Sequence, residues 1–181
     1  MIQNITSKNY VCCNFCNSEF YYDEDDLIFN EDEDLLENVH WQEVKKDGHG
    51  LLLWGGVGSG KSYMAACIAN ALLEQEVKVL MTNFATIING IFSATDKNDY
   101  VNAICGYDLL IIDDLGVESH SEYRMEGLFN VIDRRVRSGK PMIITTNLTM
   151  KEMDETQDIN EARIYDRIRS VCQPIQVKGE S

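Results

Sequence analysis

The sequence has no long apolar run, no secretory signal and few basic residues. No uninterrupted apolar stretch approaches the roughly 18 residues that a membrane-spanning helix needs. Residues 1–10 lack a basic end followed by an apolar stretch, so we expect a cytoplasmic protein with reduced thiols and no membrane contact. Lys and Arg total 16 against 30 Asp and Glu, and this net charge of −14 argues against broad non-specific binding to nucleic acid.

The six cysteines do not complete a metal-binding pattern. Cys13 and Cys16 form one C-x-x-C pair beside Cys12, whereas a structural zinc site usually contains two such pairs. His40 and His49 lie far from them along the chain. Zinc at Cys12, Cys13 and Cys16 is one interpretation and a small apolar cluster with reduced thiols is the other. The missing second pair favours reduced thiols.

Acidic residues are concentrated in the first part of the chain. Residues 1–50 hold 12 acidic and 3 basic side chains, and nine of the acids lie within residues 23–37. We predict that residues 1–47 form an acidic, Cys-containing leader, which is either a solvated segment or a docking segment for a partner protein. The remaining residues, 48–181, are long enough to bury one core and form the predicted core domain.

A phosphate-binding loop, the Walker A motif, opens this domain. An apolar run over residues 51–54 precedes the spacing G-x-x-x-x-G-K-[ST], and helix-forming residues follow. Lys61 would reach the β- and γ-phosphates of ATP, and the Ser62 hydroxyl would ligate Mg²⁺. An accidental Gly-rich turn is the alternative, which the flanking strand and helix disfavour. The predicted nucleotide contacts are Gly55, Gly56, Val57, Gly58, Ser59, Gly60, Lys61, Ser62 and Tyr63.

Strand and helix patterns alternate from residue 51 onward. Strands are predicted at 51–54, 77–82, 109–112, 142–146 and 174–177. Helices are predicted at 62–75, 84–93, 121–138 and 161–170. A further short helix is predicted to follow a polar break at 96–99 and to end at residue 105. This alternation predicts an α/β fold, a three-layer sandwich in which helices cover both faces of a five-stranded parallel sheet.

A second motif, of the Walker B kind, ends one of these strands. Four apolar residues precede Asp113 and Asp114, so the two acids emerge at the carboxyl end of a buried strand. Asp113 is placed to hold Mg²⁺ opposite Ser62, and Asp114 to orient or deprotonate the attacking water. Strands often end in an Asp-Asp turn. However, the spacing of 51 positions from Ser62 to Asp113 accommodates one helix–strand–helix unit, which predicts ATP hydrolysis.

Two further motifs lie toward the carboxyl end of the sequence. The strand that follows ends at Asn147, whose amide could bind the γ-phosphate or its attacking water; a turn or helix N-cap is the alternative. Arg163 and Arg167 are four residues apart and share a helix face. They either pair with Glu161 and Asp166 at the surface or supply an arginine finger to the γ-phosphate on a neighbouring subunit.

A resemblance to a known family is carried by four blocks, GLLLWGGVGSGKSYMAACIANALLE, LLIIDDLGVE, SEYRMEGLFNVIDRRVRSGKPMIITTNLT and ARIYDRIRS. From about His49 onward, the chain resembles the AAA+ ATPase domain of bacterial and phage replicative-helicase loaders of the DnaC and DnaI type. It is similar, somewhat less closely, to the IstB transposition helper ATPases.

The resemblance implies a P-loop NTPase of the AAA+ type, which binds ATP and Mg²⁺ and self-associates through ATP at subunit interfaces. It also implies binding to single-stranded DNA and delivery of a replicative helicase hexamer to that DNA. Asn147 is then the sensor of the γ-phosphate, and Arg167 is the first choice for the arginine finger.

Three features depart from the family pattern. The leader is short and acidic, whereas the N-terminal region of the loaders grips the helicase. Asp114 stands where many AAA+ enzymes have Glu, so we expect slow hydrolysis that assembly or DNA stimulates. The sequence stops at Ser181, before a second sensor Arg, and we expect no C-terminal helical lid. An IstB-like helper and a non-hydrolysing, ATP-dependent interaction protein are the alternative functions.

The DNA contacts implied by the resemblance fall on two segments. The loop just past the Walker B motif is where related AAA+ proteins line a central pore. There Ser121 could donate to a phosphate and Tyr123 could stack on a base. Arg134, Arg135 and Arg137 end the following helix, where they form either a DNA contact or a solvated face.

Overall fold

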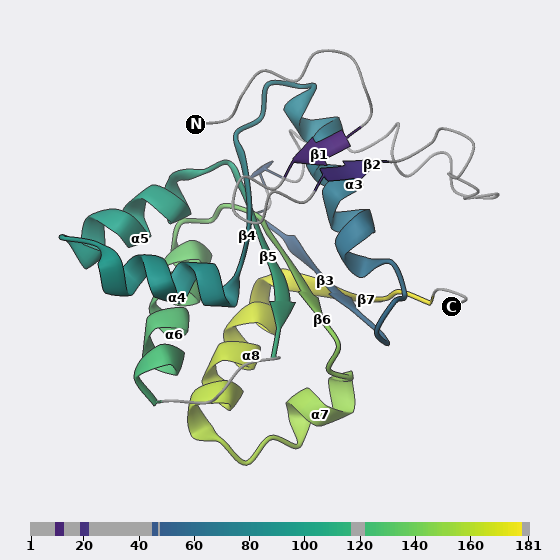
Figure 1. Cartoon of the computed structure of the whole chain (residues 1–181). Coiled ribbons are helices and arrows are strands. Elements are labelled where there is room, and N and C mark those ends of the chain that lie inside the picture. The colour runs from purple at the N-terminus through teal and green to yellow at the C-terminus, as the bar shows by residue number, and fades with distance from the viewer. Residues whose placement is uncertain (1–9, 13–18, 22–44, 47, 117–121, 179–181) are drawn as a thin grey trace.

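The computed structural model describes residues 10–12, 19–21, 45–46, 48–116 and 122–178 (Figure 1). Its main feature is a five-stranded parallel sheet with helices on both faces, as the sequence predicts. A separate antiparallel pair, β1 (Tyr10–Cys12) and β2 (Glu19–Tyr21), is not foreseen by the sequence analysis. In the described part of the chain, no helix combines the length and the apolar composition needed to cross a bilayer.

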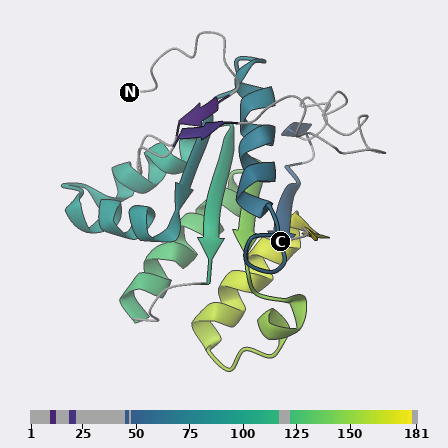
Figure 2. The ribbon, with the colours of Figure 1, turned by 45° about the vertical axis from the view of Figure 1, so that its right-hand side comes forward.

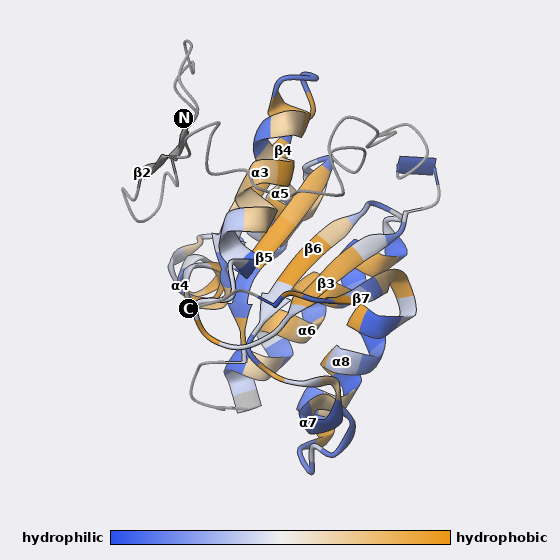
Figure 3. Cartoon of the chain, turned by 90° about the vertical axis from the view of Figure 1, so that its right-hand side faces the viewer, coloured by the Kyte–Doolittle hydropathy of each residue, from blue (hydrophilic) through white to orange (hydrophobic). Residues whose placement is uncertain are grey.

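The sheet has the strand order β4-β5-β6-β3-β7. Its members are β3 (Gly50–Trp54), β4 (Val79–Asn83), β5 (Leu109–Leu115), β6 (Met142–Thr146) and β7 (Cys172–Gln176). The inner strands carry consecutive apolar residues, drawn in orange in Figure 3, because both faces of a parallel sheet are covered. All five strands are parallel, so their carboxyl ends meet at one edge of the sheet, the lower edge in Figure 1.

The helices divide unequally between the two faces (Figure 2). They are α3 (Lys61–Leu73), α4 (Phe84–Ser93), α5 (Lys97–Gly106), α6 (Glu122–Arg137), α7 (Met150–Asp154) and α8 (Ile159–Val171). On one face, α3 packs through Ala65, Ala69 and Leu72. On the other face, α4, α5, α6 and α8 bury a larger cluster of apolar side chains.

Side-chain caps account for most helix starts. Asn83, Asp96 and Asp158 each accept a backbone N–H in the first turn of α4, α5 and α8. The helix α7 is not among the predicted helices, although Thr149 and Glu152 form a capping box there. The polar break predicted at residues 96–99 is wrong, because Asp96 is the cap and α5 starts directly after it. The other boundaries lie within three residues of the prediction.

Arg135 is a fully buried arginine of α6. Its guanidinium donates to the backbone oxygens of Cys105 at 2.9 Å, Tyr107 at 2.6 Å, Asp108 at 2.8 Å and Pro141 at 2.5 Å. Burial lowers the pKa of Arg135 to about 10, which still leaves it charged at neutral pH. Both interpretations of Arg135 from the sequence, a DNA contact or part of a solvated face, are therefore wrong: it ties α6 to the segments that lead into β5 and β6.

We predict that Arg135→Met lowers the free energy of unfolding by at least about 3 kcal/mol, because several buried carbonyl groups lose their donor together. Arg137→Met is the matched control on the same helix. Arg137 pairs with Asp133 at 2.8 Å, but its side chain is 74% exposed, so we expect a loss of about 1 kcal/mol or less. Urea denaturation of the two variants and the wild type measures both values; equal losses would contradict the structural role of Arg135.

Candidate functional site

The loop between β3 and α3 turns through left-handed glycines. Gly58 and Gly60 have φ angles of 78° and 91°, which residues with a Cβ rarely adopt. Gly60 is the N-cap of α3 and supplies no side-chain hydrogen bond, in contrast to the capped starts of α4, α5 and α8. The first N–H groups of α3 therefore remain available to an anion, and the positive end of the helix dipole favours one.

The ammonium of Lys61 lies inside the curve of this loop. Its Nζ donates to the backbone oxygens of Gly55 at 3.0 Å and Gly56 at 2.7 Å, and it lies 3.4 Å from Ser59 Oγ. Only 5% of Lys61 is exposed. A positive charge is thus held among the backbone groups of a glycine-rich loop, where it can pair with phosphate.

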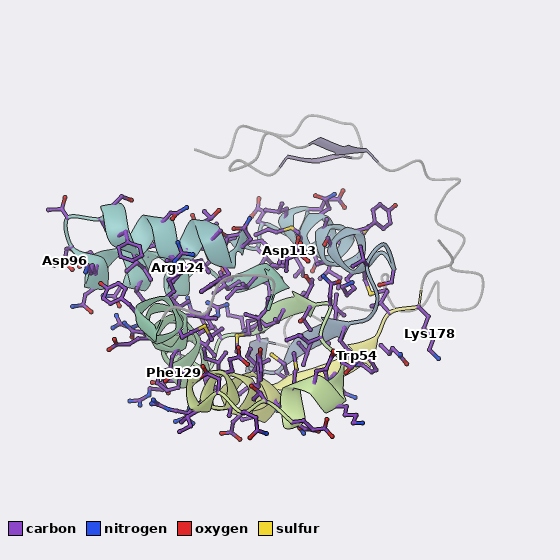
Figure 4. All side chains as sticks on the ribbon, turned by 60° about the horizontal axis from the view of Figure 1, so that its bottom comes forward. Trp54, Asp96, Asp113, Arg124, Phe129 and Lys178 are labelled. Carbon is purple, nitrogen blue, oxygen red and sulfur yellow. The ribbon has the colours of Figure 1, made fainter. Side chains whose placement is uncertain are left out.

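Ser62 and Asp113 meet at the carboxyl edge of the sheet. Ser62 Oγ on α3 donates to Asp113 Oδ1 on β5 across 2.8 Å, although the two residues are 51 positions apart. Figure 4 labels Asp113 at this edge. A hydroxyl and a carboxylate are hard oxygen donors, and Mg²⁺ in nucleotide sites takes few protein ligands alongside phosphates and water. The donor set fits the predicted metal.

A bulge interrupts the pairing of β5 with β6 at the two acids. Ile112 pairs with Ile144 and Leu115 pairs with Thr146, so Asp113 and Asp114 together stand opposite one residue, Thr145. Asp114 takes a left-handed φ of 53°. Such a conformation costs a residue with a Cβ on the order of 1–3 kcal/mol and persists where the surroundings hold it. Bulges of this kind redirect side chains next to active sites.

The carboxyl group of Asp114 sits in an unusual electrostatic setting. Its pKa is raised above the ordinary value, first by partial desolvation and second by the negative charge of Asp113, while Lys61 acts in the opposite direction. A carboxylate with a raised pKa binds a proton more readily, which suits a group expected to accept one from water.

Thr145 is a site residue that the sequence analysis does not single out. It is fully buried on β6, and its Oγ1 lies 2.9 Å from the backbone nitrogen of Asp114 and 2.5 Å from Asp113 Oδ1. One signal could have found it. Thr145 is in the predicted strand 142–146, two positions before Asn147 at the end of that strand, and residues at that spacing in an extended segment project to the same face.

Asn147 directly follows β6 beside the start of the loop. The preceding carbonyl, of Thr146, accepts the N–H of Gly55 at 3.3 Å. Asn147 is half-buried, and the N-cap of α7 is Thr149. The helix N-cap alternative for Asn147 is therefore wrong, while its predicted role as a γ-phosphate sensor stays a prediction.

A pocket of about 630 Å³ continues the loop toward the end of β7. Val177 lines it and donates its N–H to the Trp54 carbonyl at 2.8 Å, and a Cβ on Gly55 would lie only 2.3 Å from the Val177 oxygen. Figure 4 labels Trp54 and Lys178 in this region. The pocket wall includes Tyr63, which is a predicted nucleotide contact. It also includes residues at the end of β7 and just after it, which are not among the predicted contacts. It consists of Ser59, Gly60, Tyr63, Met64, Gln176, Val177 and Lys178.

The arginines of α8 contact α6. Arg167 Nε lies 3.2 Å from Asp133 Oδ1, and the Arg167 side chain is 42% exposed. The Arg163 guanidinium lies 4.2 Å from the ring centroid of Phe129, which Figure 4 labels. Both arginines therefore help to hold α8 on α6 within one chain. The role of Arg167 as a finger toward a neighbouring subunit stays a prediction.

An aromatic pair lies where α4 and α6 meet. Phe92 and Tyr123 are 53% and 47% exposed, and their ring centroids are 5.1 Å apart. Lys97 Nζ donates to the Tyr123 hydroxyl at 2.6 Å. The structure thus brings the predicted Tyr123 together with two residues, Phe92 and Lys97, that the sequence analysis does not name. We call these three residues the aromatic patch.

Other predictions fall partly outside the described residues. Cys13, Cys16 and Ser121 lie outside them, and so does most of the leader. Within residues 48–116 and 122–178, no group of three or more His, Cys, Asp or Glu side chains is arranged to hold a metal ion.

Comparison with known proteins gives a family and several relatives. The family model described as "IstB-like ATP binding protein" matches residues 23–181. The replicative helicase loader DnaC of Escherichia coli K12 is 35% identical over 120 residues, covering 64% of this chain and 48% of DnaC. The replicative helicase loader DnaI of Bacillus subtilis 168 is 28% identical over 147 residues, covering 74% and 47%. The chain thus spans about half the length of the curated relatives it matches.

Solved structures agree on the fold. A crystal structure of DnaI superposes with a TM-score of 0.66 at 26% identity and covers 86% of this chain and 87% of that one. A crystal structure of the DnaC helicase loader gives a TM-score of 0.63 at 21% identity, covering 79% and 84%, which supports the fold alone.

The predicted fold class and resemblance are confirmed. The resemblance seen in the sequence places IstB proteins behind the loaders. The two curated relatives described above are named loaders, while the matching family model carries the IstB name. This family model spans most of the sequence, and its ATP-binding description agrees with the loop, the uncapped α3 and the Ser62–Asp113 contact. The chain belongs to the IstB-like ATP binding protein family.

Proposed function

We propose that this protein is a Mg²⁺-dependent ATPase of the AAA+ type that loads a hexameric replicative helicase onto single-stranded DNA. The observation that carries the ATP part is the 2.8 Å hydrogen bond between Ser62 and Asp113, next to the uncapped start of α3. The loader part is supported by similarity to DnaC and DnaI, which are named replicative helicase loaders.

Each group near the loop has a task in this proposal. The N–H groups of residues 55–62 and the ammonium of Lys61 bind the phosphates. Ser62 and Asp113 hold Mg²⁺, which neutralises phosphate charge when bound. Asp114 orients the attacking water and accepts its proton, and Asn147 binds the γ-phosphate. The nucleoside occupies the pocket between Tyr63 and the end of β7, whose volume of about 630 Å³ falls within the range of small-molecule sites.

Nucleotide binding is tested by Lys61→Ala. We expect affinity for N-methylanthraniloyl-ATP, a fluorescent ATP analogue, to fall at least about tenfold, since a charge-assisted bond to phosphate is lost. Lys78→Ala is the control, because Lys78 is exposed and precedes β4, at the opposite edge of the sheet from the loop. Circular dichroism checks that both variants fold. A folded Lys61→Ala variant with wild-type affinity would remove the phosphate loop from the nucleotide site.

Hydrolysis is proposed to require a neighbouring subunit. The Arg167 side chain is partly exposed and held by Asp133 from within its own chain, an arrangement that could present the guanidinium to an adjoining molecule. An arginine finger is worth about 10³–10⁵ in rate, so its absence from the cis site would leave slow hydrolysis in isolated chains. ATPase activity per chain would then rise with protein concentration.

Complementation tests this arrangement. Arg167→Ala should bind ATP normally and hydrolyse it at least about tenfold more slowly. Mixing Arg167→Ala with Lys61→Ala should restore activity above the mean of the two variants, because one mixed interface joins an intact loop to an intact finger. Arg169→Ala is the matched control on α8, where Arg169 pairs with Asp154, and we expect wild-type rates. No restoration in phosphate-release assays, despite shown co-assembly, would make Arg167 a local structural residue.

Binding of single-stranded DNA is proposed at the aromatic patch. Its two exposed rings offer faces on which bases can stack, and Lys97 adds a positive charge beside Tyr123. This local arrangement is compatible with the acidic overall charge of the chain, since stacking does not require a broad basic surface.

We predict that Tyr123→Ala weakens binding to a single-stranded oligonucleotide about tenfold, as loss of one base stack implies, without changing ATP affinity. Tyr123→Phe keeps the ring and removes the hydroxyl, so its affinity should stay within about twofold of the wild type. Fluorescence anisotropy at matched salt measures the three proteins. Equal affinities for wild type and Tyr123→Ala would exclude Tyr123 from the DNA site.

A second candidate function is supported by the family name. An IstB-like transposition helper would use the same ATP site, and a preference for duplex over single-stranded DNA in these anisotropy assays would favour it. Tight ATP binding without turnover, even with single-stranded DNA present, would instead favour a non-hydrolysing interaction protein.

A further inference from the structure

We propose that Thr145 is a positioning residue that sets the geometry of both Asp113 and Asp114. The inference rests on the proposed Mg²⁺–ATP site, since it concerns the two acids of that site. Thr145 is fully buried on β6, and its Oγ1 is the atom that contacts both acids.

The direction of each hydrogen bond follows from the groups involved. The backbone N–H of Asp114 can only donate, so Thr145 Oγ1 accepts it at 2.9 Å. The hydroxyl proton is then free to be donated to Asp113 Oδ1 at 2.5 Å. One hydroxyl group thus accepts one hydrogen bond and donates another, and its two partners are adjacent residues of β5. A methyl group in its place would lose both bonds.

The first of these bonds lies within the bulge. Asp113 and Asp114 together stand opposite Thr145, and a regular ladder would offer the Asp114 N–H a backbone oxygen of β6. The side chain of Thr145 takes that place. This contact supports the left-handed conformation of Asp114, which costs free energy and needs support from its surroundings.

The second bond holds the carboxyl group of Asp113. Asp113 Oδ1 accepts from Thr145 on one side and from Ser62 at 2.8 Å on the other. Two donors on one oxygen restrict rotation of the carboxyl, and the second oxygen is oriented as a result. Partners of this type orient the ligands of metal sites, and their loss typically costs about 10–100-fold in metal affinity or activity.

Thr146 provides a matched comparison in the same strand. It is equally buried, but its Oγ1 donates to the Leu115 carbonyl at 2.7 Å and accepts the Leu148 N–H at 3.1 Å. Its hydroxyl therefore ties together backbone segments after the bulge and contacts neither carboxyl group among the described hydrogen bonds. A general loosening of β6 would follow from either substitution, whereas misplacement of the acids would follow from loss of Thr145 Oγ1 alone.

The experiment titrates Mg²⁺ against binding of N-methylanthraniloyl-ATP to the full chain. For Thr145→Val, we expect the Mg²⁺ concentration at half-maximal enhancement of binding to rise at least about tenfold. Thr145→Ser keeps the hydroxyl and should stay within about twofold of the wild type, as should Thr146→Val. Phosphate release by Thr145→Val at saturating Mg²⁺ should also fall, because Asp114 is displaced.

Five results would overturn the inference. A folded Thr145→Val variant with wild-type Mg²⁺ dependence would do so, as would an equal shift in Thr146→Val. Failure of Thr145→Ser to restore the wild-type value would do so as well. If the wild type binds nucleotide without Mg²⁺ dependence, this inference falls while nucleotide binding stands; if it binds no nucleotide, the proposed function falls too. If Thr145→Val does not fold, the same Mg²⁺ titration is done with Thr145→Ala. Its smaller side chain leaves room for a water molecule at the Asp114 N–H.

Discussion

The carboxylate of Asp113 is the point on which the candidate site depends. Its Oδ1 accepts hydrogen bonds from Ser62 on α3 and from Thr145 on β6, while Asp113 itself belongs to β5. Three elements that are distant in sequence are therefore joined through one oxygen at the carboxyl edge of the sheet. A parallel sheet favours such an arrangement, because the carboxyl ends of neighbouring strands lie on the same side.

The same site carries the main backbone strain near the loop. Left-handed residues occur at Gly58 and Gly60 before α3 and at Asp114 within β5. Glycine adopts this conformation at little cost, but Asp114 needs its surroundings to hold it. The buried layers around the site supply that rigidity, because β5 and β6 are covered on both faces by apolar clusters.

A second buried polar group supports the sheet away from the site. Arg135 binds four backbone oxygens and so fixes the segments that lead into β5 and β6. Those two strands carry Asp113 and Thr145 at their other ends. The register between them is thus held at the amino-terminal side by a charged side chain and interrupted at the carboxyl side by a bulge. The Arg135 contacts that stabilise the fold and the residues of the candidate site therefore lie at opposite ends of the same two strands.

Family membership and partner choice depend on different parts of this molecule. The proposed helicase loader and the alternative IstB-like helper would use the same loop, acids and sheet, because the same ATP site is proposed for both. What distinguishes the two is the surface that meets DNA and protein. On the described residues, the aromatic patch of Phe92, Lys97 and Tyr123 is the surface for which we propose a nucleic-acid contact.

Local signals in the sequence were enough to predict the succession along the chain of the five strands of the parallel sheet and of the helices α3, α4, α5, α6 and α8. The predicted ranges 84–93 and 142–146 match α4 and β6, since apolar runs and helix caps are encoded within a few neighbouring residues. The juxtaposition of Ser62 with Asp113 was also predictable, because a parallel α/β sheet brings strand ends to one edge. The short α7 was missed although its capping box is visible in the sequence, since five residues give too little periodicity to recognise.

Only the tertiary structure decided how individual polar side chains are used. Arg134, Arg135 and Arg137 look alike in sequence, yet Arg135 alone is enclosed, because helix packing rather than residue type determines which cation meets buried carbonyls. The bulge at Asp114 and the two bonds of Thr145 likewise depend on the register of two strands that are far apart in the chain. A sequence encodes which residues alternate between sheet and helix through local preferences, but long-range register and burial emerge only when the strands pair.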